Sequence, residues 1–460
     1  MKQWIKENKA FFLFFILISI VYLSSLLAHH DIWWDSAVFL GMGKYIYSFG
    51  GAGLWEASRP VLWPLILGLF WKLGLDAFLL GKIIVIIFSL GVILLAYLIA
   101  ASLFDRKIAF IASLFLSLSQ TFFMFSNIMH TEIPSAFFAM LGLYFFIRKR
   151  YNYSGLFLGL AFMTRFFQLF AAAPFFLLLL YLTAKNKESL RALFNFSVFF
   201  LIPVIPYLML NYLLYNNPVY PFLLQAFMTK YTGWVFSQPF YFYIISLAKE
   251  NFLAIFSIFG LALSFRKYDF GKYALAFAFL GSFVPYNMAM HKEMRLLIPA
   301  LPLLYILASY GIVYFAGLLK KKKNLVLYSM LAVFFALSLP GLRFDSYDDG
   351  LDLFYKYVEE SDVENLWISN PAFIAFSGKK ADELIYYPLY GSERIDELKK
   401  GMGNANAVLI NTCDLPCPPY DEACSQKHSG FIDLLGREFS LAQSAEKGHC
   451  AYYIFKKVYN

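Results

Sequence analysis

Two acidic residues directly after the first long apolar run are candidates for proton transfer. Asp31 and Asp35 lie in the polar stretch 29–36, which follows the apolar run 10–28. A carboxylate beside a bilayer is costly unless it has a partner or a role, and a positioned carboxylate can act as a general base. The stretch therefore has two interpretations, a site of proton transfer or an ordinary solvated loop charge.

A second polar stretch, residues 291–295, places basic and acidic side chains between two apolar segments. Lys292 and Arg295 could hold a phosphate at the membrane surface, with His291 as a further hydrogen-bond donor. The alternative is ordinary anchoring of helix ends by Lys and Arg, with Glu293 as their local partner. The residue types alone fit both an anion clamp and a helix anchor.

Arg165 stands near the middle of the apolar stretch 155–184, where an unpaired guanidinium is expensive. It needs a carboxylate partner or an anionic ligand. His130 and Glu132, in a short polar turn, could supply that partner, or they could merely cap the next helix. A carboxylate base with basic phosphate ligands, and no nucleotide motif in the sequence, suits a transferase whose activated donor is a lipid phosphate reached from the bilayer.

The segments that must position these residues are long and apolar. Of the 460 residues, 60% are hydrophobic and only 15% are charged, whereas soluble domains carry about 25% charged residues. Segments of about 20 residues cross a bilayer, which predicts about eleven transmembrane helices. The segment 60–76, broken by prolines, is expected to lie at the interface without spanning. The expected crossings are 10–28, 78–101, 108–126, 132–147, 155–184 (two short helices), 193–214, 243–265, 273–290, 296–317 and 324–342.

The distribution of basic residues predicts the orientation in the membrane. If the N-terminus is inside, the predicted cytoplasmic segments hold 18 of the 27 Lys and Arg residues of residues 1–342, and cytoplasmic loops normally carry such an excess. We therefore expect a multi-pass integral membrane protein with a cytoplasmic N-terminus. The first apolar run resembles a signal peptide in part, but we interpret it as a retained helix. The candidate residues and the polar tail then lie on the extracytoplasmic side.

Residues 343–460 form a polar tail that we expect to fold apart from a transmembrane domain, residues 1–342. The tail holds 12 basic and 19 acidic residues, a net charge of −7, and the rest of the chain has a net charge of +16. A basic membrane part with an acidic tail does not suggest nucleic-acid binding. Segments with helical and strand-like patterns alternate along the tail, which predicts a small α/β domain. The expected helices are 349–360, 392–401 (capped by a serine) and 421–435, and the expected strands are 364–369, 405–411 and 451–456.

All four cysteines lie in the tail. An even number confined to one polar domain suggests disulfides and an oxidising compartment. Reduced buried thiols and a zinc site are the alternatives, although the spacing fits no common zinc module well. One arrangement bridges the two cysteines that are close in sequence and pairs the other two, and two other connectivities are possible. The four residues are Cys413, Cys417, Cys424 and Cys450.

Several short motifs resemble the GT-C glycosyltransferases. The stretch 33–39, with the later segment 59–65 that begins Arg59-Pro60, is similar to the first outer loop of prokaryotic members. Residues 291–295, His-Lys-Glu-Met-Arg, resemble the His-Lys-Glu-x-Arg-Phe motif of the dolichol-phosphate-mannose-dependent mannosyltransferases that extend lipid-linked glycans and GPI anchors. Leu296 replaces the usual Phe. Residues 159–165 are also similar to a segment common in these enzymes.

The resemblance implies an all-α polytopic membrane domain of the GT-C type with a small extracytoplasmic α/β C-terminal domain. It implies transfer of a sugar, mannose by the motif, from a polyprenyl- or dolichyl-phosphate donor to a lipid-linked glycan or glycolipid acceptor. The enzyme would lie in the plasma membrane if its source is prokaryotic or archaeal. No metal ion or other cofactor is expected.

By the same resemblance, Asp35 is the base that takes the proton of the acceptor hydroxyl, so that the anomeric configuration inverts. Lys292 and Arg295, with His291 and Arg165, would stabilise the leaving phosphate. The family often has a second acidic residue where this chain has Ser36. That difference leaves Asp35, or Asp31 before it, to act as the base.

Three other functions compete with this one. A transporter or flippase for lipid-linked saccharides would also use intramembrane charges, but such proteins often show internal repeats, and the sequence shows none. A protein O-glycosyltransferase or oligosaccharide ligase would share the architecture and differ in its acceptor. A scaffold that binds a partner through its tail would need none of the charged clusters.

Overall fold

The computed structural model describes residues 7–27, 32–232, 234–343, 364–386, 392–447 and 449–458. The chain divides into two compact units. Unit 1 comprises residues 1–28, 82–218 and 238–345, and unit 2 comprises residues 29–81, 219–237 and 346–460. Unit 2 is thus assembled from three separate stretches of the chain, including the stretch that holds Asp35.

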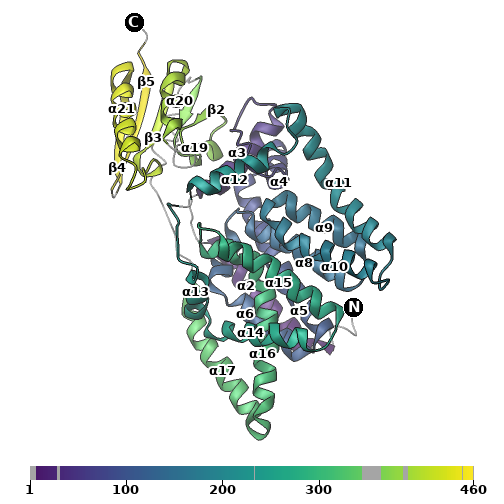
Figure 1. Ribbon diagram of the computed structural model, residues 1–460. Helices are drawn as coiled ribbons and strands as arrows, with labels where there is room; N and C mark the ends of the chain where they lie inside the picture. Colours follow the sequence, from purple (N-terminus) through teal and green to yellow (C-terminus); the bar gives the residue numbers. More distant parts are fainter. Residues whose placement is uncertain are drawn as a thin grey trace. The chain divides into compact units, whose positions relative to one another are not determined.

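Unit 1 is helical throughout its described residues (Figure 1). Three of its helices begin at polar caps: the side chains of Asp105, Ser189 and Asp269 each accept a hydrogen bond from a backbone N–H of the first turn. The elements are α2 (Lys9–Ser24), η1 (Ser25–Leu27), most of α5 (Ala77–Leu103), α6 (Arg106–Ser117), α7 (Gln120–Met124), η2 (Phe125–Asn127), α8 (Glu132–Ile147), α9 (Tyr151–Thr164), η3 (Phe166–Gln168), α10 (Leu169–Ala184), α11 (Leu190–Tyr215), α13 (Phe242–Glu250), η4 (Phe252–Ile255), α14 (Phe256–Arg266), α15 (Phe270–Met288), η5 (Met294–Ala300), α16 (Leu301–Leu318), η6 (Lys320–Lys322), α17 (Lys323–Ser338) and η7 (Leu339–Gly341).

Each predicted crossing coincides with a helix or a broken helix, but several are shorter than a full span. Among the described residues, six helices are long and apolar enough to cross a membrane, or seven if one bent pair counts as a span. That pair, α6 with α7 and η2, bends by 59°. The expected count of about eleven is higher because four expected crossings are not among these candidates. Residues 132–147 and 243–265 form shorter apolar helices, and α9 and α15 do not meet the criteria of length and hydropathy together. The predicted break of 155–184 is present, since α9 ends at Thr164 and η3 begins at Phe166.

Two glycines allow α9 and α11 to pack with their backbones in close contact. A Cβ added at Gly155 would lie 2.1 Å from the carbonyl oxygen of Phe196, and one at Gly159 would lie 2.4 Å from that of Phe200. Side chains larger than hydrogen would therefore separate the two helices. Small residues four apart are a common device for such close helix packing in membranes, and here they fix the helix that leads into Arg165.

Unit 2 joins the loop after the first helix to the α/β tail. The loop holds two helices. The sequence predicted one of them, α4 (Leu62–Lys72), which lies in the predicted interfacial segment. It did not predict the other, α3 (Trp34–Tyr47). A further helix, α12 (Tyr220–Thr232), was not expected either. The tail contains α19 (Ala372–Phe376), α20 (Glu393–Gly401), η8 (Met402–Asn404), η9 (Thr412–Asp414) and α21 (Glu422–Glu438), with strands β1 (Leu366–Ile368), β2 (Ala381–Leu384), β3 (Ala407–Asn411), β4 (Phe439–Lys447) and β5 (Cys450–Lys457).

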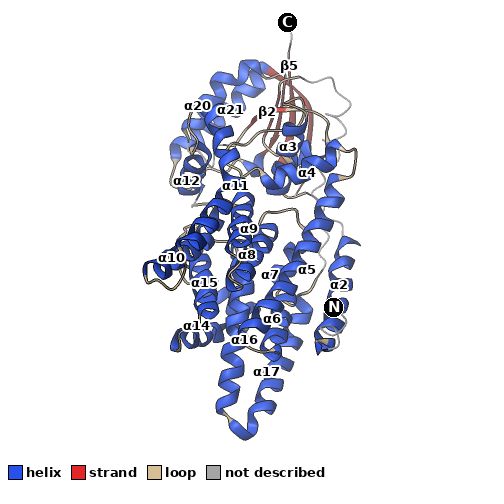
Figure 2. Ribbon diagram, turned by 90° about the vertical axis from the view of Figure 1, so that its right-hand side faces the viewer, coloured by secondary structure: helices blue, strands red, loops and turns tan. Residues whose placement is uncertain are grey.

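The five strands form one mixed sheet in the order β2-β1-β3-β5-β4. Strand β1 is parallel to both β2 and β3, and β5 is antiparallel to β3 and β4. Helices α20 and α21 pack side by side on one face (Figure 2), where Leu398 and Phe431 join Val408 and Phe455 in an apolar core. The continuous apolar run of β3, which is buried along its whole length, and the apolar stripes of both helices contribute to the same core.

Most tail elements lie where the sequence placed them. The predicted strands at 364–369, 405–411 and 451–456 correspond to β1, β3 and β5, and the predicted helices at 392–401 and 421–435 to α20 and α21. Ser392 precedes α20, but its side chain makes no capping hydrogen bond. The predicted helix at 349–360 lies outside the described residues. Strands β2 and β4 and the short helix α19 were not predicted, because their sequences lack a clear alternation.

A buried lysine connects the loop to the tail within unit 2. The ammonium group of Lys44, in α3, donates to the carbonyl oxygens of Ile374, Ala375 and Ser377 at distances of 3.0, 2.6 and 3.0 Å. These carbonyls lie in and just after α19, so the lysine satisfies groups that a helix end leaves without partners. The backbone of Gly53 also pairs with the chain around Lys380. The N–H of Gly53 donates to the carbonyl of Lys379 at 2.9 Å, and its carbonyl accepts from the N–H of Ala381 at 2.8 Å.

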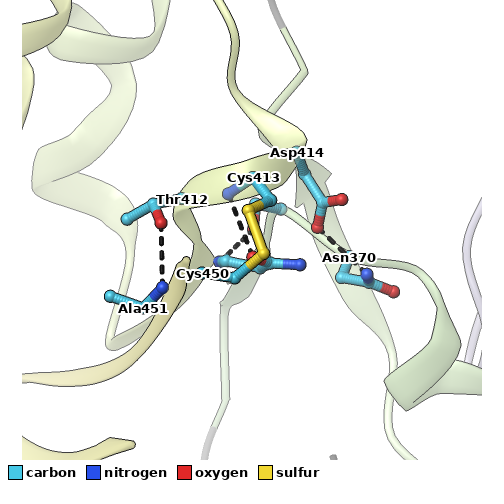
Figure 3. Close-up of a disulfide and its surroundings, with 8 residues drawn as sticks. Asn370, Thr412, Cys413, Asp414, Cys450 and Ala451 are labelled. Carbon is cyan, nitrogen blue, oxygen red and sulfur yellow. Dashed lines mark hydrogen bonds between the residues drawn. A yellow bond between two sulfur atoms is a disulfide. The ribbon is translucent and has the colours of Figure 1, made fainter. Parts of the chain in front are cut away.

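All four cysteines are joined in disulfides, Cys413 with Cys450 and Cys417 with Cys424. The first bridge ties η9 to the start of β5, beside a hydrogen bond from the backbone of Ala451 to Thr412 (Figure 3). This is the arrangement that bridges the two cysteines close in sequence. Among the described residues, one group of potential metal ligands consists of His449 with these bridged cysteines, whose bonded sulfurs are not thiolate ligands.

Candidate active site

Arg165 has a carboxylate partner inside unit 1. Its Nη1 lies 3.0 Å from Oε1 of Glu132 and donates to the hydroxyl of Thr131 at 3.2 Å, while its Nε donates to the hydroxyl of Tyr286 at 3.3 Å. Arg165 has an extended backbone (φ −154°) between α9 and η3. The helix break thus directs a guanidinium toward the first turn of α8, which begins at Glu132. This pairing was one of the two interpretations of the 130–132 turn.

Arg295 is held by the glutamate two residues before it. Its Nε and Nη2 donate to the two carboxylate oxygens of Glu293 at 2.9 Å and 3.0 Å, a bidentate arrangement. His291 lies 2.6 Å from Oε1 of the same carboxylate. Although partial burial opposes the charge of Glu293, these bonds to His291 and Arg295 lower its pKa to about 2. The carboxylate is therefore ionised throughout the physiological pH range.

The two arginines meet at one buried carboxylate. Nη1 of Arg295 lies 3.8 Å from Oε1 of Glu132 and 3.3 Å from Nδ1 of His130. The side chain of Glu132 is only 2% exposed, whereas those of Arg165 and Arg295 are 16% and 15% exposed. We call Glu132, Arg165, Glu293 and Arg295 the arginine network. Glu132 lies deeper than both guanidinium groups, whereas the Glu293 side chain is 24% exposed. The two carboxylates hold two partly exposed cations in fixed orientations.

Lys292 is not part of this network in the described structure. Its ammonium group is buried and donates to the backbone carbonyl oxygens of Gln238 and Ala289 at 3.0 Å and 2.5 Å. The neighbouring main chain is held as well, because the hydroxyl of Tyr243 donates to the carbonyl of Glu293 at 3.2 Å. These contacts agree with the helix-anchor interpretation of Lys292, one of the two interpretations of residues 291–295.

Asp35 belongs to a second charged group, which lies in unit 2. It occupies the first turn of α3, and its Oδ1 lies 2.8 Å from Nη2 of Arg59. Nε of Arg59 in turn donates to Oε1 of Glu56 at 3.2 Å, and the hydroxyl of Ser58 donates to the same oxygen at 2.8 Å. Burial opposes the charge of Arg59, but Asp35 and then Glu56 raise the pKa of the guanidinium above its ordinary value. Asp31 lies outside the described residues.

Sequence reasoning did not assign several residues that contact the charged groups. Glu56 lies 21 positions after Asp35, and only the fold of the loop brings both carboxylates to Arg59. Tyr286 is buried within an apolar helix, and nothing in the sequence of that helix marks it as a partner of a charged side chain. Thr131 was visible only as a possible cap. The position of Glu56, three residues before Arg59, is a local signal for their pair, because an arginine near a bilayer requires partners.

Comparisons with known proteins give a match to one family and to several solved structures. Residues 58–210 match the family described as Dolichyl-phosphate-mannose-protein mannosyltransferase. No curated protein matches the chain in sequence. The matched range includes Arg59, Glu132 and Arg165, which come from both charged groups.

Solved structures resemble nearly the whole chain at low sequence identity. ArnT from Cupriavidus metallidurans bound to undecaprenyl phosphate has a TM-score of 0.64 at 14% identity, with 97% of this chain and 98% of that chain covered. The Archaeoglobus fulgidus oligosaccharyltransferase tethered to an acceptor peptide has a TM-score of 0.62 at 10% identity, covering 98% and 74%. The mycobacterial arabinofuranosyltransferase AftD has a TM-score of 0.53 at 12% identity, covering 96% and 42%.

Proposed function

The chain has the fold of the GT-C glycosyltransferases, and from this fold we propose that it is a membrane glycosyltransferase that uses a polyprenyl-phosphate sugar as its donor. The observation that carries the proposal is the arginine network of unit 1. Two guanidinium groups that carboxylates hold in place, both partly exposed, form a ready site for a monophosphate. The ArnT structure with undecaprenyl phosphate supports the donor class.

The arginine network would stabilise the leaving group. Breaking the bond between the sugar C1 and the phosphate oxygen leaves a second negative charge on the polyprenyl phosphate. Arg165 and Arg295 would interact more strongly with that dianion than with the donor's monoanion, which is the condition for lowering a barrier. Among the described residues, none accepts a hydrogen bond from Nη2 of Arg165, so one guanidinium edge remains for the phosphate.

Asp35 is the proposed base. The oxygen of the acceptor hydroxyl attacks C1, its proton passes to the carboxylate of Asp35, and the phosphate leaves from the opposite face, so the configuration inverts. Arg59 holds this carboxylate in a fixed orientation through their ion pair. A polyprenyl monophosphate is a reasonable leaving group.

We propose mannose as the sugar and a lipid-linked glycan or glycolipid as the acceptor. The His-Lys-Glu-x-Arg motif supports mannose, and so does the description of the matched family. A protein acceptor is the second candidate, because that description names protein as acceptor and the archaeal oligosaccharyltransferase was solved with an acceptor peptide. We further propose that both charged groups face the extracytoplasmic side, in accord with the basic loops expected in the cytoplasm.

A transfer assay with the full-length protein tests the proposal. The purified protein, reconstituted in nanodiscs, is incubated with polyprenyl phosphates carrying labelled mannose or one of several other sugars, and with panels of glycolipid and peptide acceptors. We expect labelled product together with free polyprenyl phosphate, with mannose preferred. Movement of intact donor across a vesicle membrane without cleavage of the C1–oxygen bond would instead identify a transporter.

A further inference from the structure

The three parallel strands of unit 2 end at one edge of the sheet, and each is soon followed by a polar residue. Tyr386 comes after β2, Asn370 after β1 and Asp414 after β3. Because parallel strands run in the same direction, their carboxyl ends meet at the same edge. The fold therefore brings a phenol, an amide and a carboxylate from three separate loops to one place.

The sheet order makes this edge a switch point. The order β2-β1-β3 means that the chain leaves the central strand β1 toward one side to form β2 and then returns to the other side to form β3. In open α/β sheets, ligands bind outside the carboxyl ends of the strands at such a point, where neighbouring loops diverge. Asn370 and Asp414 follow the two strands that flank the switch point, β1 and β3.

Side-chain contacts at this edge reach the loop that holds Asp35. The amide of Asn370 donates to Oδ2 of Asp414 at 3.0 Å (Figure 3). The ring of Tyr386 lies 4.9 Å from that of Trp34, the residue directly before Asp35. Burial, followed by Asp414 and Asp35, raises the pKa of Tyr386. All these residues are only partly buried, so the edge is open to a ligand.

One carboxylate oxygen of Glu56, the residue paired with Arg59 beside Asp35, has no donor within the described part of the chain. Oε1 of Glu56 accepts from Ser58 and Arg59, but Oε2 is buried and has no hydrogen-bond partner among the described residues. The Glu56 side chain is 10% exposed and acts electrostatically on Tyr386. Leaving a buried acceptor without a donor costs free energy. A ligand that offers hydroxyl donors would remove that cost.

We propose that this edge, formed by Trp34, Glu56, Tyr386, Asn370 and Asp414, is a binding subsite for a saccharide of the acceptor. Sugar hydroxyls donate to carboxylates and both donate to and accept from amide groups. The apolar face of a pyranose ring packs on aromatic rings. The inference deepens the proposed function, on which it rests, because it assigns acceptor recognition to the tail and the base to the loop beside it.

Direct binding tests the subsite without any transfer. Saturation-transfer NMR is recorded on the full-length protein in detergent with methyl mannopyranoside, other methyl hexopyranosides and a mannotriose as probes. We expect a signal for at least one saccharide, and at least fivefold weaker binding in Asp414→Asn and Asn370→Ala. The matched control is Asp433→Asn, which removes an exposed carboxylate from α21 of the same domain and should bind as the wild type does. Thermal unfolding checks that each variant is folded.

The outcomes separate the subsite from the proposed function. Saccharide binding that persists in Asp35→Asn, and fails in Asp414→Asn, supports the subsite even if no sugar transfer is ever detected. Equal binding by the wild type and both subsite variants, or no binding of any saccharide, overturns it. Uptake of Mn²⁺ that depends on Asp414, without a saccharide signal, would show that the carboxylates hold a cation and would also overturn it.

Discussion

At the scale of single residues, the arginine network explains how two cations stay close together beside a membrane. Both carboxylate oxygens of Glu293 accept hydrogen bonds from Arg295, and the buried Glu132 lies against both arginines. Each guanidinium is thereby oriented before a ligand arrives, which lowers the entropy that binding would cost. The carboxylates also reduce the net positive charge, which lowers the repulsion between the two guanidinium groups before a ligand binds.

We expect Arg295→Ala to lower kcat/KM for the donor by about 10²–10³-fold, because one stabilising contact to the departing phosphate is lost. Arg295→Lys should recover little of this, since an ammonium group cannot form the bidentate pair with Glu293. Steady-state transfer kinetics measure both. The comparison variant is Lys292→Ala, whose side chain holds backbone carbonyls. It should lower thermal stability while kcat of the folded fraction stays within a few fold. The reverse pattern would return the phosphate contact to Lys292.

The pH dependence of stability should reveal Glu293. Its folded-state pKa, about 2, is below its ordinary value of 4.5. A lowered carboxylate pKa stabilises the fold above the unfolded-state value and loses that contribution as the pH falls through the folded-state value. The difference in melting temperature between the wild type and Glu293→Gln should therefore be constant from about pH 5 to about pH 8 and shrink below about pH 4. A difference that grows on acidification would contradict this assignment.

At the scale of elements, breaks in helices carry the polar groups. The α9–η3 break presents Arg165, and the short α3 helix, which the sequence did not predict, begins with Trp34 and Asp35. Lys44, further along α3, fixes that helix against α19. The position of Asp35 thus depends on contacts made by the tail, although the two are far apart in sequence.

Replacing Lys44 by Met should test this anchor. The change keeps the length of the side chain but leaves three carbonyl oxygens without their donor, at a cost of about 2–4 kcal/mol in total. We expect a lower melting temperature and faster proteolysis of the tail. Limited protease digestion with mass spectrometry measures the rate of proteolysis. Lys72→Met, at the partly exposed end of α4, is the control. Equal stability of the two variants would mean that α3 and α19 do not need the lysine.

The two disulfides should differ in what they stabilise. The Cys413–Cys450 bridge closes a separation of 37 residues and the Cys417–Cys424 bridge one of 7. Loop-closure entropy then gives about 4 kcal/mol for the longer loop and about 2 kcal/mol for the shorter. Double serine variants of each pair, compared by thermal unfolding, should show the larger loss for Cys413 and Cys450. A larger loss for the short loop would point to local packing of α21 as the main effect.

At the scale of the whole molecule, the sequence predicted the helical membrane part and the α/β tail, and it named as candidates most of the residues of the two charged groups, but not Glu56. Apolar length and period-2 alternation carry those signals locally. The participation of Glu56 could not be predicted, because it depends on how the loop folds back to Arg59. The mixed order of the sheet and the assembly of unit 2 from three stretches also depend on contacts between distant residues, which no local pattern encodes.

The predicted orientation needs its own test. Single cysteines introduced at Lys322, in the basic turn before α17, and at the exposed Tyr420 of the tail offer one reporter on each side. The native cysteines are all bridged. An impermeant maleimide applied to intact cells should label the tail position and not Lys322, which should react only after lysis. Labelling of Lys322 in sealed cells would reverse the proposed topology.

The anchor at Lys44 also sets an order of events during synthesis. Its three carbonyl partners lie 330 to 333 positions further along the chain. At about 5–20 residues per second, a ribosome needs on the order of 20–60 s to reach them. Throughout that interval, the ammonium group of Lys44 and helix α3, which begins beside Asp35, lack their final partners. The loop can therefore complete these contacts only after nearly the whole chain has been made.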